Sequence, residues 1–515
     1  MATPGEKLAE SLGKLKAVQD KSVVAIKADE LTRVHRERLV KNGFIQEVVK
    51  GWYIATPHDT KAGESTAWFT SFWSFCAGYL QARFGEDYCV SAEQSLLLHA
   101  GSTVVPSQLI IRAPKGNNAI TQLIHNTSLF VMKSPLPDVA EIETINDIRA
   151  LSLESAIVHS LPSIFQKNNI DVRAALMQVK DASQLLEILL NGGHSKIAGR
   201  LVGAYRNLGE NKTADNILKT MKAAGYDVRE SDPFESPTPV KLSSREASPY
   251  VNRLRLMWEN MRPNVVKAFP KAPGISKKKT ETLAQIEDIY TTDAYHSLSI
   301  ERYTVSAALI ERVRSVDWNA SENEADRKHK DAMAARGYWE AFKEVEKSIE
   351  KILDGKNAGA MADEDHGDWF RALFAPSVAT GILRPGDLAG YRTNQVYIGN
   401  SKHVPLNKES VRDTMPLLFE LLENEPEASV RAVLGHFMFV YIHPYMDGNG
   451  RIGRFLMNAM LVSGGYPWTV IPVEERDQYM SALESASVNQ DIKPFAEFMA
   501  DLVKANMSGK PKATI

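Results

Sequence analysis

The 515-residue sequence lacks the features that mark several protein classes. It has only two cysteines, Cys76 and Cys89, and they form neither a C-x-x-C pair nor a cluster with histidine. Two cysteines are too few to cross-link several domains, which argues against a secreted disulfide scaffold and a structural zinc site. No run approaches the roughly 18 uninterrupted apolar residues that cross a bilayer, and the first residues hold no apolar signal core. These absences predict a soluble cytoplasmic protein without a membrane partner.

The sequence also has no excess of charge of either sign. Its 61 basic and 63 acidic side chains leave a net charge of -2, so any surface for a polyanion must be local. A hydrophobic content of 44% with 24% charged residues is ordinary for globular proteins and excludes a disordered or fibrous chain. At roughly 150 residues per domain, the length predicts three to four domains.

The clearest change in composition lies between residues 229 and 250, where four prolines alternate with serines and acidic residues. Such a stretch is typical of a linker. We predict a mainly α-helical protein, with an all-helical C-terminal core that carries a small β-hairpin. The expected divisions are an α+β domain over 1–130, a helical domain of unassigned role over 131–228, the linker over 229–250, the C-terminal domain over 251–503 and a tail over 504–515.

The most informative segment is His443 to Arg454, with the sequence HPYMDGNGRIGR. Apolar residues recur at i, i+3, i+4, i+7 and i+8 on both sides of it, from Val430 to Tyr441 and from Ile452 to Met460. This spacing predicts two amphipathic helices joined by a loop. Gly448 to Gly453 also fits G-x-G-x-x-G, the dinucleotide-binding pattern of oxidoreductases. That pattern requires a preceding strand, so the helical spacing disfavours it.

The loop contains the groups needed to hold phosphate and to move a proton. Its glycines and the free backbone amides at the start of the second helix form an anion site. Arg451 and Arg454 are three residues apart, so they share a helical face and can reach successive phosphates. Asp447 supplies the single carboxylate that Mg²⁺ commonly takes beside phosphate oxygens. His443 titrates near neutrality and suits a general base.

HPYMDGNGRIGR resembles the signature of Fic-domain proteins, His-x-Phe-x-Asp/Glu-Gly-Asn-Gly-x-x-Arg, with Tyr445 where the family has Phe. The resemblance covers roughly residues 251 to 503. It implies AMPylation, the transfer of AMP from ATP to a Ser, Thr or Tyr hydroxyl of a target protein with release of pyrophosphate. The related death-on-curing kinases have Ala-Asn-Lys in place of Gly-Asn-Gly and lack the second arginine, which favours AMP transfer over phosphate transfer.

The resemblance also assigns roles to the residues of the loop. His443 would be the general base and Asp447 the Mg²⁺ ligand. Gly448, Asn449 and Gly450 would line the anion hole, with Asn449 on the α-phosphate. Arg451 and Arg454 would reach the β- and γ-phosphates of ATP.

Upstream, Ser297-Leu-Ser-Ile-Glu301 resembles the family's inhibitory motif, Ser/Thr-x-x-x-Glu-Gly/Asn. The resemblance implies that Glu301 pairs with Arg454 and so keeps the γ-phosphate of ATP from that arginine. Default activity should then be low. Arg302 stands where the family has Gly or Asn. A further implication is that Glu301 positions water for removal of AMP from modified targets.

Residues 395 to 406 predict a β-hairpin, because Val396 and Ile398 alternate with polar neighbours before the turn-forming Gly399-Asn400-Ser401. The hairpin resembles the family's flap, which would hold a target segment by main-chain pairing. An ordinary surface hairpin is an equally good interpretation. His436 is expected to be a buried structural residue.

Near the N-terminus, residues 31 to 42 predict a basic amphipathic helix, with Leu31, Val34 and Leu39 facing inward. Residues 43 to 55 then predict a β-wing with Gly51 at its turn. Helix and wing resemble the winged-helix antitoxin domain of abortive-infection systems, a DNA-binding autoregulator. The residues that would contact duplex DNA are Arg33, Arg36, Arg38 and Lys50.

Six basic and four acidic side chains between residues 27 and 53 are only a weak electrostatic signal for DNA. The winged helix could equally serve protein contacts. The rival to an AMP-transferase is therefore a DNA-binding regulator or toxin-antitoxin component with residual or self-directed activity. The sequence also allows a homo-oligomer.

Overall fold

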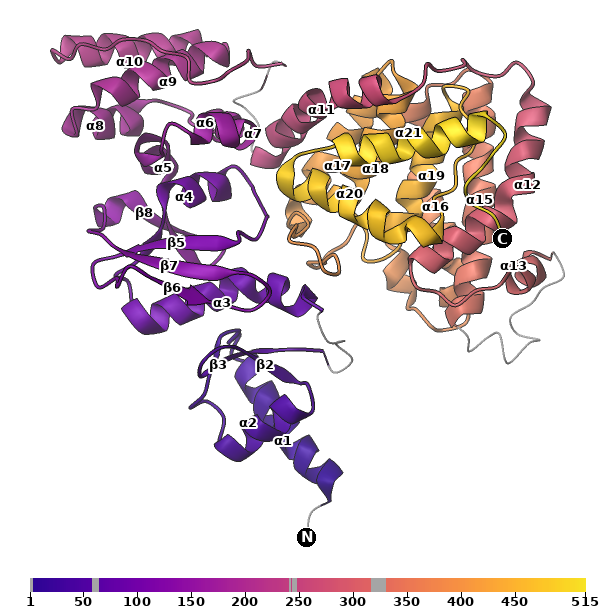
Figure 1. Cartoon of the computed structure of the whole chain (residues 1–515), viewed down its shortest axis with the longest axis horizontal. Coiled ribbons are helices and arrows are strands. Elements are labelled where there is room, and N and C mark those ends of the chain that lie inside the picture. Colours follow the sequence, from indigo (N-terminus) through magenta and orange to yellow (C-terminus); the bar gives the residue numbers. More distant parts are fainter. Residues whose placement is uncertain (1–2, 58–63, 240–241, 243–247, 316–329) are drawn as a thin grey trace. The chain divides into compact units, whose positions relative to one another are not determined.

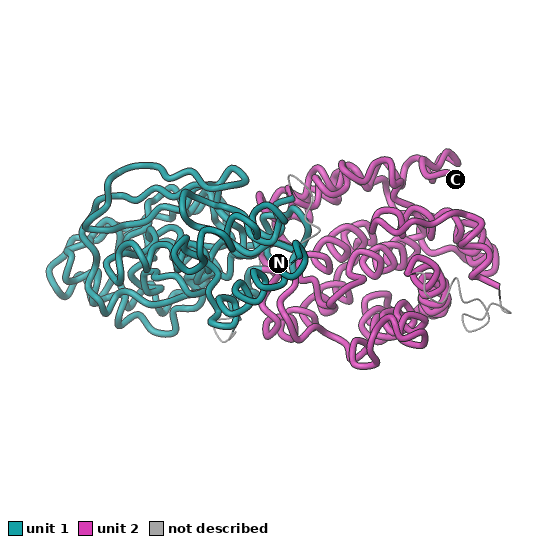
Figure 2. The backbone as a smooth tube through the Cα atoms, turned by 90° about the horizontal axis from the view of Figure 1, so that it is seen from below, with its two compact units in different colours: residues 1–253, 397–404 teal, residues 254–396, 405–515 magenta. Residues whose placement is uncertain are grey.

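The structure is a computed structural model of the chain, which describes residues 3–57, 64–239, 242, 248–315 and 330–515. It divides into two compact units (Figure 2). The first unit contains residues 1–253 and 397–404, and the second contains 254–396 and 405–515. Residues 240–241 and 243–247 of the predicted linker lie outside the described residues.

The chain begins with two helices and a three-stranded antiparallel sheet (Figure 1). The elements are α1 (Pro4–Gln19), β1 (Ile26–Lys27), α2 (Arg33–Lys41), β2 (Ile45–Val49) and β3 (Trp52–Ala55), with strand order β1-β3-β2. Thr3 and Glu6 form a capping box that starts α1. Gly51 has a φ of 81°, the left-handed conformation that the turn between β2 and β3 requires. The predicted helix and β-wing are therefore confirmed as elements.

The inward face predicted for α2 is wrong at one position. Leu31 and Leu39 are buried, but Val34 is 60% exposed. Thr32 caps the helix, so Leu31 precedes it. Val34 lies five residues before Leu39, which places the two side chains about 140° apart around a helix of 3.6 residues per turn. His35, which is four residues before Leu39, faces α1 instead and contacts Ser11 Oγ through its Nδ1 at 2.9 Å.

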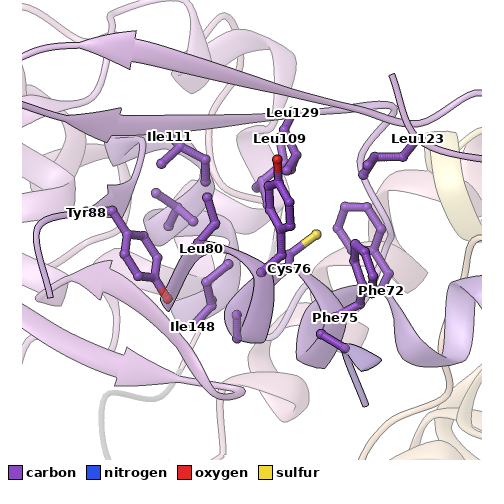
Figure 3. Packing of buried hydrophobic residues seen from close by; sticks show 14 of the residues in the cluster. Phe72, Phe75, Cys76, Leu80, Tyr88, Leu109, Ile111, Leu123, Leu129 and Ile148 are labelled. Atoms are coloured by element: carbon purple, nitrogen blue, oxygen red, sulfur yellow. The ribbon is translucent and has the colours of Figure 1, made fainter. Parts of the chain in front are cut away.

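A second, mixed sheet follows with strand order β4-β5-β7-β6. It consists of β4 (Cys89–Val90), β5 (Gln108–Ala113), β6 (Ala119–Gln122) and β7 (Ser128–Lys133), with β5 and β7 parallel. Helices α3 (Thr66–Phe84) and α4 (Ala92–His99) accompany it. Phe72, Phe75 and Leu80 of α3 are fully buried in one apolar cluster with alternate residues of β5 and β7, as Figure 3 shows. Burial of these large apolar side chains drives the packing of α3 against the sheet.

The region expected to be helical from residue 131 opens with strands instead. After the 3-10 turn Val139–Glu141, β8 (Ile142–Ile145) and β9 (Ile148–Leu151) form an antiparallel hairpin. Its two turn residues, Asn146 and Asp147, have φ values of 50° and 67°. Asn and Asp tolerate this left-handed geometry, which the tightest hairpin turns require. Helices begin only afterwards: α5 (Leu153–His159), α6 (Ile164–Lys167), α7 (Asn169–Leu176), α8 (Ser183–Asn191), α9 (Ser195–Asn207) and α10 (Asn211–Ala223).

The first part of the predicted linker packs within the first unit. The Ser231 amide donates to the Gly199 carbonyl at 3.1 Å, and the buried Arg173 donates to the Ser236 carbonyl at 2.7 Å. A Cβ at Gly199 would lie 1.9 Å from the Arg229 carbonyl oxygen, so the small residue permits this close approach. The composition of residues 229–238 therefore does not indicate an unattached linker, because their polar groups are bonded to α7 and α9.

The second unit is helical, which confirms the predicted mainly α fold. Its helices are α11 (Pro249–Ala268, which starts in the first unit), α12 (Lys279–Ile300), α13 (Ala307–Arg314), α15 (Lys330–Leu353), α16 (Ala358–Ala379), α17 (Lys408–Asn424), α18 (Ala428–Ile442), α19 (Asn449–Val462), α20 (Arg476–Asn489) and α21 (Lys493–Met507), with 3-10 turns at Pro385–Leu388 and Val473–Glu475. None of the helices that the structure describes is long and apolar enough to cross a membrane. The cytoplasmic location stays a prediction.

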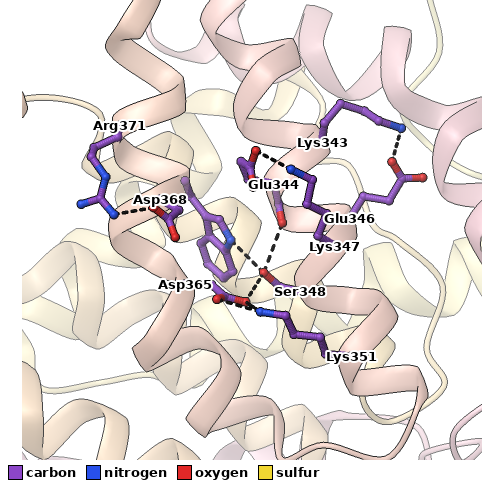
Figure 4. Close-up of polar contacts among 10 residues, drawn as sticks. Lys343, Glu344, Glu346, Lys347, Ser348, Lys351, Asp365, Asp368 and Arg371 are labelled. Carbon is purple, nitrogen blue, oxygen red and sulfur yellow. Dashed lines mark hydrogen bonds and ion pairs between the residues drawn. The ribbon is translucent and has the colours of Figure 1, made fainter.

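Polar contacts fix α15 against α16 (Figure 4). The buried Ser348 hydroxyl donates to Asp365 at 2.7 Å and accepts from the Trp369 indole at 3.0 Å. Lys351 pairs with Asp365 at 2.9 Å. These contacts fix the rotation of α16 relative to α15. The same helix carries Phe370 and Phe374, which contact the loop described below.

The β-hairpin predicted for residues 395–406 is wrong, because this described segment contains no strand. Residues 397–404 belong to the first unit. The Val105 amide donates to the Lys402 carbonyl at 2.9 Å, and His403 forms an isolated antiparallel bridge with Val104. The side-chain oxygen of Asn400 accepts from the Ser65 amide at 2.9 Å. Backbone at Lys402 and His403 and the side chain of Asn400 therefore bind residues far away in the sequence.

Candidate active site

The loop from His443 to Gly448 joins the end of α18 to the start of α19, as the sequence predicts. Both of its ends have left-handed backbone, with φ of 56° at His443 and 84° at Gly448. Glycine adopts this conformation freely, whereas histidine does so at a cost. The structure must therefore hold the backbone at His443 in place.

Arg392 provides this hold. Its Nε donates to the His443 carbonyl at 2.8 Å, and its backbone amide donates to the Pro444 carbonyl at 2.9 Å. The side chain is buried, and its Nη1 and Nη2 donate to the carbonyls of Asn394 and Leu406. Sequence analysis missed Arg392, because a lone arginine 51 residues before the loop carries no recognisable motif.

The imidazole of His443 has the geometry of a general base. Its Nδ1 lies 3.1 Å from the Val440 carbonyl oxygen. A carbonyl can only accept a hydrogen bond, so Nδ1 carries the proton and Nε2 keeps its lone pair. Burial lowers the pKa of His443 to about 4, and the nearby Arg392 charge acts in the same direction. The ring is therefore neutral at physiological pH and can take a proton.

Asn449 and Tyr445 brace the loop from inside. The Asn449 side chain accepts from the Tyr445 amide and donates to the Tyr445 carbonyl, each at 2.9 Å. The buried Tyr445 ring stacks on Phe370 of α16, with centroids 3.9 Å apart. Tyrosine thus fills the position of the family's phenylalanine as an aromatic anchor. The side-chain oxygen and one side-chain N–H of Asn449 are therefore bonded to the backbone of the loop.

The glycines at the start of α19 admit close neighbours. A Cβ at Gly448 would lie 2.8 Å from the Phe374 ring, and a Cβ at Gly450 would lie 2.2 Å from Glu301 Oε1. The carboxylate of Glu301 therefore lies on the first turn of α19, where backbone amides and the helix dipole attract an anion. Asp447 accepts from the Gly448 amide at 2.6 Å and keeps its side chain 64% exposed. Its carboxylate can thus accept a cation from solvent.

The predicted pair between Glu301 and Arg454 is present. Arg454 Nη2 donates to Glu301 Oε1 at 2.8 Å and to the Ser297 carbonyl at 3.0 Å, while Arg454 Nε donates to Ser297 Oγ at 2.8 Å. Loss of hydration opposes both charges, although the side chain of Glu301 keeps 34% of its surface exposed. The positive charge of Arg454 nevertheless lowers the pKa of Glu301, and the Glu301 carboxylate raises the pKa of Arg454. The side chain of Arg454 is only 4% exposed, so water screens its charge little and the charge interacts mainly with Glu301.

Arg451, the other arginine of the loop, has different neighbours. Its guanidinium lies 5.2 Å from the centroid of the Tyr303 ring and 5.1 Å from that of Phe374. Asp447 Oδ1 is 3.4 Å from Arg451 Nη2. The structure thus brings together His443, Asp447, Gly448, Asn449, Gly450, Arg451, Arg454, Ser297 and Glu301.

Three further residues carry predictions from the sequence: His436 and Val396 of the second unit and Ile398 of the first. His436 is completely buried, and its Nε2 lies 2.7 Å from the Tyr479 hydroxyl. The burial expected for His436 is confirmed, and its structural role stays a prediction. Val396 is buried and Ile398 is half-buried, and neither lies in a strand. Their role as a target flap stays a prediction.

The residues predicted to contact DNA lie on α2 and the wing of the first unit. Arg36 donates to the carbonyls of Ala28 and Leu31, and Arg38 donates to the Lys7 carbonyl and to Ser11 Oγ. Arg33 forms an exposed pair with Glu37 at 2.7 Å, and Lys50 is exposed. Arg36 and Arg38 are thus hydrogen-bonded within their own domain, whereas Arg33 and Lys50 are exposed. DNA binding stays a prediction.

Comparison with known proteins agrees with this geometry. Residues 368–461, which include α18, the loop and most of α19, match the model of the Fic/DOC family. The chain carries a Fic/DOC-family domain. Within the Fic domain, the loop residues of the sequence signature occupy the end of α18, the connecting loop and the first turns of α19.

Curated relatives of the chain include fruit-fly proteins named protein adenylyltransferase Fic. The Drosophila willistoni protein is 37% identical over 131 residues, which are 25% of this chain and 26% of the relative. The Drosophila yakuba protein is 29% identical over 229 residues, 43% of this chain and 42% of the relative. The chain therefore spans well under half the length of these relatives. Among solved structures, a Fic-1 fragment from C. elegans covers 67% of this chain and 98% of its own, with 18% identity and a TM-score of 0.37.

Proposed function

We propose that the chain is a protein adenylyltransferase that moves AMP from ATP to a hydroxyl group of a target protein. In this reaction the target oxygen attacks the α-phosphorus, and the bond from that phosphorus to the bridging oxygen of the β-phosphate breaks. Pyrophosphate leaves, and the hydroxyl proton passes to Nε2 of His443. The names of the fruit-fly relatives support the reaction class.

One observation carries the proposal: a neutral, half-buried imidazole at the C-terminus of α18 and an anion site at the N-terminus of α19 are only a few residues apart. The Val440 carbonyl fixes the tautomer of His443, so its basic nitrogen is Nε2. Gly448 and Gly450 place no side chain of their own over the first turn of α19, so its amides can bind phosphate oxygens once the Glu301 carboxylate leaves Gly450, and Arg451 and Arg454 add two cations. Phosphoryl-type transfer depends mainly on this kind of positioning and charge neutralisation.

The residues around the loop also fit Mg²⁺. Asp447 supplies one largely exposed carboxylate, and phosphate oxygens and water would complete the octahedral shell that Mg²⁺ prefers. Within the described residues, no group of three or more His, Cys, Asp or Glu side chains could hold a metal alone. In this proposal Asp447 binds the ion together with the nucleotide. When bound, Mg²⁺ would neutralise charge on the phosphates.

We further propose that Glu301 inhibits the enzyme. Its carboxylate holds Arg454 at 2.8 Å and lies over Gly450, where a phosphate oxygen would otherwise bind. ATP must then displace a paired carboxylate to bind productively, which keeps default activity low. The opposite reaction is the alternative: Glu301 would orient water for removal of AMP from a modified target.

Transfer of label from ATP tests the proposal. Full-length protein with Glu301→Gly is incubated with Mg²⁺, a cell lysate and ATP labelled at either the α- or the γ-phosphate. We expect only the α label to enter protein, at a rate at least tenfold above that of the unmodified chain. His443→Ala in the same background should abolish labelling. Met446→Ala is the matched control, because Met446 lies in the same loop with an exposed side chain.

The outcomes of this experiment distinguish AMP transfer from kinase activity and inhibition by Glu301 from de-AMPylation. Transfer of the γ label would indicate a kinase and overturn the proposal. Equal labelling with and without Glu301→Gly would remove the inhibitory role. If Glu301→Gly instead slows the release of AMP from labelled protein, the de-AMPylation alternative is correct. Mass spectrometry of the labelled proteins would identify the target and the modified hydroxyl.

A further inference from the structure

The turn that follows Glu301 has a defined geometry. Helix α12 ends at Ile300, and Arg302 has a φ of 67°. The Arg302 amide donates to the Ser299 carbonyl at 2.9 Å, and the Tyr303 amide donates to the Leu298 carbonyl at 3.1 Å. These two bonds define a Schellman cap. The cap fixes the position of Tyr303 relative to Glu301, so the two residues form one rigid unit at the end of α12.

This cap brings the Tyr303 ring to Arg451. The Arg451 guanidinium lies 5.2 Å from the Tyr303 centroid and 5.1 Å from the Phe374 centroid, both within the range of cation–π attraction. The ammonium of Lys330 lies 5.6 Å from the same Tyr303 ring. Glu301 and Tyr303 thus each contact one of the two arginines of the Fic loop, Glu301 with Arg454 and Tyr303 with Arg451.

Arg451 has a buried hydrogen-bond donor that is not satisfied by any residue that the structure describes. Its side chain is 2% exposed, and among the described residues its buried Nε has no hydrogen-bond partner. The distance of 3.4 Å to Asp447 Oδ1 is long for a charge-assisted bond. A buried donor without a partner is unfavourable, and an incoming phosphate oxygen would relieve it. The aromatic contact therefore keeps Arg451 in a position where its Nε donor is not satisfied within the described part of the chain.

We propose that Tyr303 is a positioning residue and makes a second inhibitory contact. Tyr303 holds Arg451, while Glu301 holds Arg454. The inference rests on the proposed function, because it assumes that Arg451 binds nucleotide phosphate. A nucleotide must displace the Tyr303 ring from Arg451 as well as the Glu301 carboxylate from Arg454. The two contacts act on different arginines, so loss of the ring should strengthen ATP binding even where Glu301 has already been removed.

Binding of MgATP to full-length protein tests this inference without turnover. His443→Ala is the parent, and the Kd for MgATP is measured by calorimetry with Tyr303→Ala or Tyr303→Phe added, with and without Glu301→Gly. Loss of a cation–π contact corresponds to a decrease in Kd of about 2- to 30-fold for Tyr303→Ala. Tyr303→Phe keeps the ring but removes the hydroxyl, which also interacts with Arg451, so it should lower the Kd by less than Tyr303→Ala does. With His443 restored, Tyr303→Ala should lower KM for ATP by a similar factor and change kcat less.

Tyr295→Ala is the matched control, because Tyr295 is a half-buried tyrosine of α12 whose ring contacts His296. If it lowers the Kd as much as Tyr303→Ala does, the effect comes from a loosened helix and the inference is wrong. An unchanged Kd for Tyr303→Ala would also overturn it. Thermal unfolding checks that each variant folds, and Tyr303→Leu, which keeps bulk without an aromatic face, replaces an unfolded Tyr303→Ala with the same expectation.

The two proposals fail in different ways. If MgATP binds and responds to Tyr303→Ala but no variant transfers the α label, only the proposed transfer is wrong. If Glu301→Gly stimulates transfer while Tyr303→Ala changes neither Kd nor KM, only the role of Tyr303 is wrong. If MgATP binds to none of the variants, both proposals are wrong.

Discussion

At the scale of single residues, His443 determines how the proposed reaction should respond to pH. A free imidazole has a pKa of about 6.5, but burial lowers the pKa of His443 to about 4. The base functions only while it is neutral, so activity is lost as the pH falls through the pKa of the folded protein. The Nδ1 bond to Val440 additionally keeps Nε2 as the basic nitrogen.

We therefore expect the kcat/KM of Glu301→Gly protein to stay nearly constant from pH 8 to about pH 5 and to decline around pH 4. The measurement is initial-rate transfer of the α label across this range, with circular dichroism at each pH to confirm that the protein is folded. An acid limb centred near pH 6.5 would show that His443 is solvated as in a free peptide, and would contradict the desolvation that lowers its pKa.

At the scale of elements, the C-terminus of α12 contains a strained residue. Arg302 adopts a φ of 67° within the Schellman cap, a conformation that costs a residue with a Cβ about 1–2 kcal/mol. The same position carries Gly or Asn in the inhibitory motif that the sequence resembles. The structure explains this preference, because Gly and Asn reach left-handed backbone more easily.

Arg302→Gly should therefore stabilise the cap. We expect the free energy of unfolding to rise by up to about 1 kcal/mol, since part of the relieved strain is offset by the greater entropy of glycine in the unfolded chain. Transfer of the α label should fall, because Glu301 and Tyr303 would be held more firmly. Chemical denaturation and initial-rate labelling measure the two effects.

Arg302→Ala is the control for this prediction. It removes the cation but keeps the Cβ, so the backbone strain remains. A gain in stability for Arg302→Ala equal to that for Arg302→Gly would mean that the charge, not the backbone, destabilises the cap.

At the scale of the whole molecule, a net charge of -2 leaves no general attraction for nucleic acid. The DNA-binding hypothesis thus depends on the few exposed cations of α2 and the wing. Arg36 and Arg38 are bonded to carbonyl groups of their own fold, so their replacement should lower stability whether or not DNA binds. Arg33 and Lys50 are exposed and separate the two effects.

The hypothesis predicts that full-length Arg33→Ala/Lys50→Ala protein keeps its melting temperature but binds duplex DNA more weakly. If each cation contacts one phosphate, the slope of log K against log salt should become shallower by about 2. Fluorescence anisotropy with labelled duplex at several salt concentrations measures this slope. An unchanged slope, or no binding at low salt, would favour a protein partner for the winged helix.

The sequence by itself determined the features that depend on neighbouring residues. The period of the apolar residues on both sides of HPYMDGNGRIGR predicted α18 and α19, because helical spacing requires only residues close in the chain. The glycines and charges of the loop likewise predicted an anion site. The motif around Glu301 implied its pair with Arg454 through resemblance to a family, although the two residues are 153 positions apart.

Only the tertiary structure decided the contacts between segments that share no local pattern. Residues 395–406 have the alternation of a hairpin, yet the segment takes its partners from residues 65 and 104–105. Arg392 holds the backbone of His443, and Tyr303 covers Arg451. Hydrogen bonding and apolar burial can be satisfied by many alternative partners in a sequence of this length, and the partners that are used follow from the packing of the whole chain.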